Sequence, residues 1–162
     1  QGWETDFLHY GTPAERVAMS IPANRRMLLI HNVKATKEDI ATIEQHFTNG
    51  VYWVLCPESN RFISRTEPPA KTLRNAGVKI AIGTDSLASA RHLSMVENMR
   101  LLGDIPLDEL LIWATRNGAE ALGLEASLGD IRVGTSPGIV VIEGADLQNM
   151  RVTDQTRSRR II

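Results

Sequence analysis

Three short apolar runs at nearly regular intervals place the strongest constraint on how this chain can fold. They begin near residues 28, 51 and 78, so about 23 and 27 residues separate one start from the next. That spacing is close to the ~30 residues of a β-α-β unit and favours parallel strands in an α/β fold. The first two runs are apolar throughout, which is typical of strands buried on both faces, and the third tolerates Lys79. The runs are Met27–Ile30, Val51–Leu55 and Val78–Ile82.

Helix signals fill the segments between and after these runs. Thr36 is a suitable N-cap with Asp39 three residues further on, and Gly50 ends the apolar pattern that follows. Later segments have Pro106 at a helix start and Gly123 at a helix end. These signals predict helices within residues 36–50, 70–76, 93–102, 106–114 and 119–122, followed by strands at 131–133 and 139–142.

Composition and charge narrow the class of protein. The 162 residues include 18 basic and 19 acidic side chains, and this balance creates no field that would attract polyanions. We therefore expect no nucleic-acid partner, and the arginines of residues 157–160 resemble a frayed, solvated tail. No apolar stretch approaches the ~18 residues needed to span a bilayer, so no membrane partner is expected. The single cysteine, Cys56, excludes an internal disulfide and favours a reducing, cytoplasmic location.

Each of the three predicted strands ends in polar residues. The polar segments are His31-Asn32, Cys56–Asn60 and Gly83–Ser86. Parallel α/β folds bind ligands at the carboxyl ends of their strands, so we expect a site at this edge. The serines near Asp85 lack the Gly-x-Ser-x-Gly pattern of serine hydrolases, and the glycine there lacks the lysine of a phosphate loop.

Each of these residues also has an ordinary structural interpretation. His31 is either a ligand or acid–base group, or a hydrogen-bonded structural residue. Asp85 is either a metal ligand or general base, or the residue that forms a turn or caps the next helix. Cys56 has no basic neighbour in the sequence, which favours a small buried residue over a nucleophile. His46 and His92 are expected at the surface.

Taken together, the motifs resemble one known family. Their order and spacing are similar to those of the C-terminal half of the metal-dependent amidohydrolase superfamily, in the branch of chlorohydrolases and nucleoside or cytosine deaminases. The resemblance runs from about residue 27 to 144 and departs at Leu55-Cys56, where relatives often carry His-Asn. The segments that carry it are Leu28–Asn32, Leu55–Asn60, Ile82–Ser89, Leu122–Leu124 and Gly129–Ile131.

The resemblance implies a partial (β/α)8 barrel in an α/β protein. The three runs would correspond to strands six to eight, and the C-terminal strands to part of a small β-sandwich. A complete barrel needs about 250 residues, and the chain begins at Gln1 with no initiator Met, so we expect a fragment or a processed chain. The expected divisions are a lead-in over 1–26, barrel over 27–125, sandwich strands over 126–150 and a basic tail over 151–162.

The resemblance also implies a mechanism. In this family a divalent metal, commonly zinc, activates water that attacks an electrophilic carbon and cleaves a C–N or related bond. Asp85 would be the metal-linked carboxylate that accepts the proton of the water, and His31 would polarise the substrate. His9 lacks the glutamate that normally follows the family's preceding histidine ligand. The remaining residues expected to bind or line the small-molecule substrate are Asn32, Cys56, Ser59, Asn60, Ser86 and Ser89.

A fragment of this kind has expected properties of its own. One carboxylate cannot hold zinc against water, so we expect an inactive piece that shows no tight, stoichiometric binding in a zinc titration. A cut barrel leaves strand edges exposed, and these favour self-association. Two alternatives stay open: a barrel that has lost catalysis, and a small-molecule-binding α/β module that folds as a monomer with one self-contained sheet.

Overall fold

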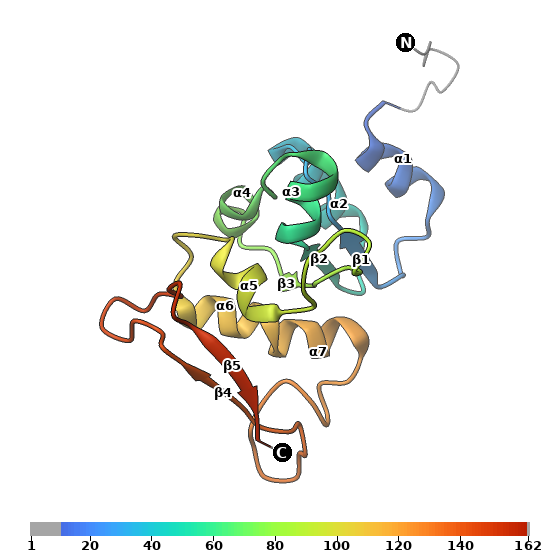
Figure 1. Ribbon diagram of the computed structural model, residues 1–162. Helices are drawn as coiled ribbons and strands as arrows, with labels where there is room; N and C mark the ends of the chain where they lie inside the picture. The colour runs from blue at the N-terminus through green and yellow to red at the C-terminus, as the bar shows by residue number, and fades with distance from the viewer. Residues whose placement is uncertain (1–10, 162) are drawn as a thin grey trace.

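A three-stranded parallel sheet lies at the centre of the computed structural model, which describes residues 11–161 (Figure 1). Its strands are β1 (Met27–Ile30), β2 (Val51–Leu55) and β3 (Ile80–Ile82), in the order β1-β2-β3. Both strand pairs are parallel. The predicted α/β class with parallel strands is therefore confirmed.

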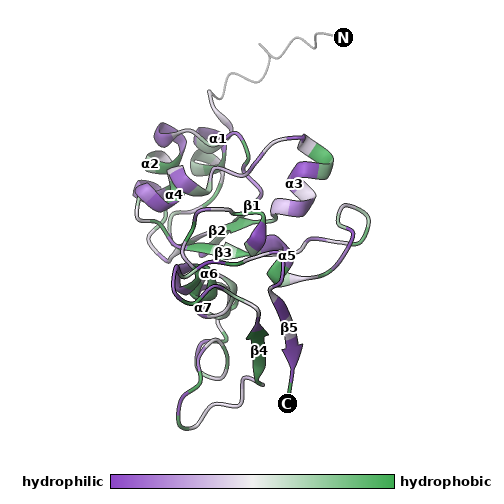
Figure 2. Cartoon of the chain, turned by 60° about the vertical axis from the view of Figure 1, so that its left-hand side comes forward, coloured by the Kyte–Doolittle hydropathy of each residue, from purple (hydrophilic) through white to green (hydrophobic). Residues whose placement is uncertain are grey.

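Helices connect and surround these strands, and most lie where the sequence predicts them. Figure 2 shows α2 and α4 above the strands and α6 and α7 below them in that view, and α2, α4, α5 and α6 contribute apolar side chains to the same core. α3 was not predicted, because it follows β2 directly and leaves Phe62 and Ile63 exposed, so it shows no buried apolar stripe. The helices are α1 (Pro13–Ser20), α2 (Lys37–His46), α3 (Pro57–Ser64), α4 (Ala70–Asn75), α5 (Met95–Arg100), α6 (Leu107–Ala114) and α7 (Arg116–Leu122).

One face of the sheet carries the core. The register sets Leu29 beside Trp53 and Trp53 beside Ile80, and this row packs against apolar side chains of α2, α4, α5 and α6. The other face is open at β1, where Leu28 and Ile30 are 37% and 53% exposed. The expectation that β1 is buried on both faces was wrong, because no element among residues 11–161 covers its second face.

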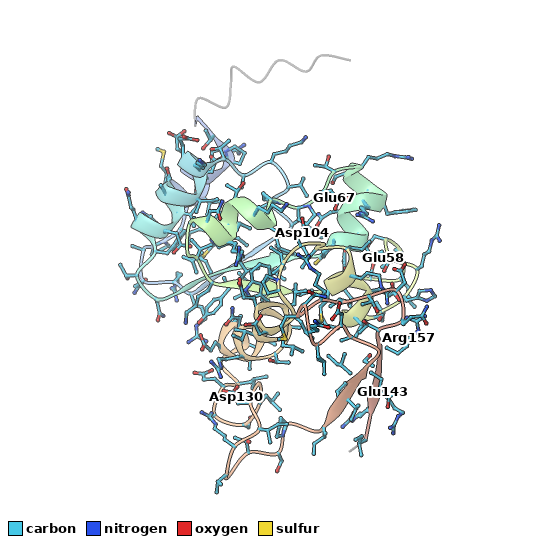
Figure 3. All side chains as sticks on the ribbon, turned by 90° about the vertical axis from the view of Figure 1, so that its left-hand side faces the viewer. Glu58, Glu67, Asp104, Asp130, Glu143 and Arg157 are labelled. Carbon is cyan, nitrogen blue, oxygen red and sulfur yellow. The ribbon has the colours of Figure 1, made fainter. Side chains whose placement is uncertain are left out.

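The C-terminal region forms a separate two-stranded sheet. β4 (Val140–Glu143) pairs antiparallel with β5 (Arg157–Arg160), and the facing residues Glu143 and Arg157 are labelled in Figure 3. The Arg159 guanidinium lies 3.4 Å from the Glu143 carboxylate. Arg100 of α5 donates to the carbonyl oxygens of Thr153 and Thr156 and so attaches this hairpin to the body of the protein. The arginines of 157–160 are thus part of a strand, and the expectation of a frayed tail was wrong.

One predicted strand is missing from the structure. Residues 131–133, expected as a strand, form no strand, and Ile131 and Val133 are largely exposed. Alternating apolar residues alone do not make a strand where no neighbouring strand pairs with them. Within the described residues, no helix is long and apolar enough to cross a membrane.

Candidate active site

The carboxyl ends of β1 and β3 leave the sheet through unusual backbone conformations. His31, Asn32 and Asp85 have φ angles of 72°, 46° and 60°, in the left-handed region that costs a residue with a side chain about 1 kcal/mol or more. The His31 amide still donates to the Val54 carbonyl oxygen at 2.9 Å, so the turn begins while the chain is held to β2. Both potential acid–base side chains therefore start from turns that the surrounding structure must enforce.

The first turn of α3 supplies the other half of the site. Pro57 begins the helix directly after Cys56, which places Ser59 and Asn60 on its first turn, where they are 1% and 2% exposed. Asn98 of α5 is fully buried, and its Oδ1 accepts from the Glu58 amide at 3.0 Å. Asn98 was not predicted, although a polar residue within the apolar stripe of α5 was a signal for a buried structural role.

Three side chains converge on a single oxygen of Asp85. Ser59 Oγ donates to Oδ2 at 2.6 Å, Ser89 Oγ donates to it at 2.9 Å, and His31 Nε2 lies 3.7 Å from it. Ser94, not Asp85, caps α5, so the interpretation of Asp85 as a helix cap does not hold. The structure thus brings together the residues of three separate strand ends.

The electrostatics of this cluster favour an ionised carboxylate. The pKa of Asp85 lies below its ordinary value, first because Ser59 donates a hydrogen bond and second because Ser89 does. Partial burial opposes this effect, and the nearby His31 ring adds a smaller lowering of the pKa. An ionised carboxylate at neutral pH can accept a proton or bind a cation.

Cys56 lies beside this cluster without the properties of a nucleophile. Its side chain is buried, and the pKa of its thiol is raised to about 11, mainly because burial disfavours the thiolate and also because Asp85 is negative. A Cβ atom built at Gly83 would lie 3.2 Å from Cys56 Sγ, so the thiol fills the space beside that glycine. The protonated thiol is a packing group here.

The other expected site residues differ in their placement. Asn60 Nδ2 lies 3.3 Å from His31 Nδ1, within the cluster. Asn32 bonds its own strand at the Ile30 carbonyl oxygen, and the recorded contacts of residues 11–161 do not join the Asn32 or Ser86 side chain to that of Asp85. His46 contacts the Ile21 carbonyl oxygen at 2.9 Å, while His9 lies outside the described residues.

The donor set is suited to part of a metal site and not to a whole one. An imidazole and a carboxylate are suitable ligands for zinc, and Asp85 and His31 are of these types. Protein zinc sites take about four ligands, yet no group of three or more His, Cys, Asp or Glu side chains that could hold a metal occurs among residues 11–161. Any metal bound here would need ligands from outside that part of the chain.

The fold and the site together define a class. This is an α/β protein with an acid–imidazole pair at the carboxyl edge of parallel strands, the edge at which α/β enzymes bind their substrates. Comparison with known proteins identifies the family within this class. The chain belongs to the amidohydrolase family, whose model matches residues 7–162.

Individual relatives agree with this assignment. The chain is 34% identical over 128 residues to a 5-methylthioadenosine/S-adenosylhomocysteine deaminase of Moorella thermoacetica. The matched segment covers 72% of this chain and 29% of the relative. It is similar in structure to an adenosine deaminase of Xanthomonas campestris with bound zinc, with a TM-score of 0.73 and 30% identity over 85% of this chain and 34% of the other. The chain therefore spans about a third or less of these relatives.

A third comparison supports the fold alone. The zinc-complexed atrazine chlorohydrolase of Arthrobacter aurescens superposes with a TM-score of 0.75, covering 94% of this chain and 37% of that protein. Its sequence identity is 22%, so the likeness concerns the arrangement of strands and helices.

Proposed function

We propose that the intact protein is a metal-dependent hydrolase that cleaves C–N bonds, of the deaminase type. The observation that carries this proposal is the convergence of Ser59, Ser89 and His31 on Asp85 Oδ2 at the carboxyl edge of the sheet. Membership of the amidohydrolase family and the names of its relatives support the same chemistry. Those names also favour an aminated purine nucleoside as the small-molecule substrate.

The proposal includes a place for this chain in a larger fold. We assign β1, β2 and β3 to strands six, seven and eight of a (β/α)8 barrel over residues 27–125. β4 would belong to a small β-sandwich over 126–150, and its pairing with β5 suggests that the sandwich continues into 151–162. The length of the relatives supports this assignment, because the chain covers 29% of the Moorella thermoacetica protein.

In the proposed reaction each residue has a distinct task. The Asp85 carboxylate accepts a proton from the attacking water and returns it to the leaving amine, for which its ionised state is required. His31, half exposed beside it, donates toward the charge that develops on the substrate. A divalent metal, zinc by analogy with the zinc-bound adenosine deaminase, would supply water of lowered pKa once its remaining ligands are present.

An activity assay of the intact protein tests this proposal. We expect the zinc-loaded protein to release ammonia from aminated purine nucleosides and to lose this activity after treatment with a chelator, with recovery on adding zinc back. Pre-loading with zinc removes an empty metal site as a cause of inactivity. Absence of ammonia release from nucleosides, free nucleobases and triazines alike would contradict the proposal and favour a barrel that only binds its ligand.

The isolated chain has a testable property of its own. We expect it to self-associate as its concentration rises, because no strand of residues 11–161 pairs with the outer edge of β1 and the exposed Leu28 and Ile30 side chains can pack against another copy. Sedimentation velocity should show the average mass falling in a Leu28→Lys, Ile30→Lys variant. Phe62→Lys, at an apolar residue of α3 that is even more exposed than Leu28 and Ile30, is the control and should leave the association unchanged. A monomer at all concentrations would rule out this behaviour.

A further inference from the structure

We propose that Asn60 is a positioning residue that keeps the proton of the neutral His31 ring on Nε2, the nitrogen that faces Asp85. The inference rests on the proposed function for its catalytic meaning and on the contacts of His31 for its structural content. It assigns Asn60 to the imidazole and not to the substrate.

The ring nitrogen that faces Asp85 is favoured as a hydrogen-bond donor. His31 Nε2 lies 3.7 Å from Asp85 Oδ2, an oxygen that already accepts from Ser59 and Ser89. A bare Nε2 would direct its lone pair at this anionic oxygen, which is repulsive, whereas an N–H at Nε2 is attracted to it. A neutral His31 ring is therefore more stable with its proton on Nε2.

The other ring nitrogen, Nδ1, is then an acceptor that needs a hydrogen-bond donor from the protein. A neutral ring with its proton on Nε2 has an unprotonated Nδ1, which accepts hydrogen bonds. Asn60 Nδ2 lies 3.3 Å from this nitrogen and can donate to it. With the amide turned over, Asn60 Oδ1 would face Nδ1 and favour a proton there. Asp85 and Asn60 would then favour the proton on different nitrogens of the same ring.

Burial restricts Asn60 to this task. The residue is 2% exposed, and its Oδ1 has no hydrogen-bond partner among residues 11–161. A buried oxygen without a partner is unfavourable, so this orientation of the amide needs a compensating contact, and the hydrogen bond from Asn60 Nδ2 to His31 Nδ1 supplies it. A single turn of α3 thus orients both groups: Ser59 holds the carboxylate, and Asn60 holds the imidazole.

Nitrogen-15 NMR of the histidine rings in the full chain tests this inference directly. At a pH where the rings are neutral, long-range proton–nitrogen spectra report which ring nitrogen carries the proton. We expect the Nε2-protonated form for His31, whose signals are assigned by their loss in a His31→Gln variant. His46 is an internal reference for this form, because its Nε2 must donate to the Ile21 carbonyl oxygen, and exposed His92 is the solvent reference.

Two variants at Asn60 test whether this residue controls the position of the His31 proton. Asn60→Asp places an acceptor opposite Nδ1 and should place a proton on that nitrogen of His31. Asn60→Leu removes the donor without adding charge, remains informative if the buried aspartate unfolds the chain, and should raise the Nδ1-protonated fraction. Asn75→Asp, at an exposed residue of α4, is the matched control and should change nothing.

The outcomes distinguish this inference from the proposed function. An Nδ1-protonated His31 in the unmodified chain, or a His31 spectrum that is the same in the folded Asn60 variants, would overturn the role of Asn60. Neither result bears on whether the intact protein hydrolyses C–N bonds, because the measurement involves no turnover. Conversely, an inactive intact protein whose His31 shows the expected response would refute the hydrolase proposal alone.

Discussion

Replacing Asp85 with asparagine in the intact protein is expected to lower kcat/KM for C–N bond hydrolysis by about 10²- to 10⁴-fold. Asparagine has nearly the same shape, and its amide oxygen can still accept from Ser59 and Ser89. It cannot accept and return a proton at neutral pH, and it is a weaker ligand for a cation. The loss should therefore come from chemistry and not from unfolding.

Steady-state kinetics together with thermal unfolding separate these two causes. Asp104→Asn is the matched control, because Asp104 is an exposed aspartate that pairs with Lys71 and Arg151 at the surface. It should keep kcat/KM within a few-fold of the unmodified protein. Comparable rates for the Asp85 and Asp104 variants would remove Asp85 from the reaction.

Replacing Trp53 with alanine is expected to lower the free energy of unfolding of the chain by about 3–5 kcal/mol. Trp53 occupies the middle strand, is 2% exposed and packs in the core between the sheet and its helices. Its indole Nε1 also donates to Glu44 Oε1 of α2 at 2.8 Å. Domains are stable by only ~5–15 kcal/mol, so this single change should remove much of the stability.

Urea unfolding of three variants measures the size and origin of this loss. Trp53→Phe keeps most of the apolar contact but loses the bond to Glu44, and should cost clearly less than the alanine variant. Phe62→Ala removes an aromatic ring that is 66% exposed, and should change the free energy of unfolding by less than ~0.5 kcal/mol. An alanine variant at Trp53 no less stable than that at Phe62 would contradict this description of the core.

The regular elements were predictable where a local signal existed. Apolar runs and caps such as Thr36 and Gly123 are read within a few residues, and they correctly indicated the parallel strands and most helices. Whether a run is covered on one face or two depends on distant elements, which is why the exposure of Ile30 was missed. The same holds for β5, since a basic segment becomes a strand only when β4 is there to pair with it.

The site was predictable as a set of residue types and less so as a network. The parallel arrangement implies that His31, Ser59 and Asp85 share an edge, and the structure brings them together around Asp85 Oδ2. Sequence order could not reveal that Asn98 holds the Glu58 amide from 40 residues away, because that contact exists only after α5 packs beside α3. The catalytic roles of His31 and Asp85 are proposed from the family resemblance and the geometry together.

The position of zinc in the intact protein would show whether Asp85 is part of the metal site. Anomalous scattering from crystals of the zinc-loaded protein locates the ion without reference to any assumed mechanism. We expect a single strong peak beside the Asp85 carboxylate, at the carboxyl edge shared by β1, β2 and β3. A fully occupied zinc ion elsewhere, with Asp85 still bonded only to Ser59 and Ser89, would contradict it.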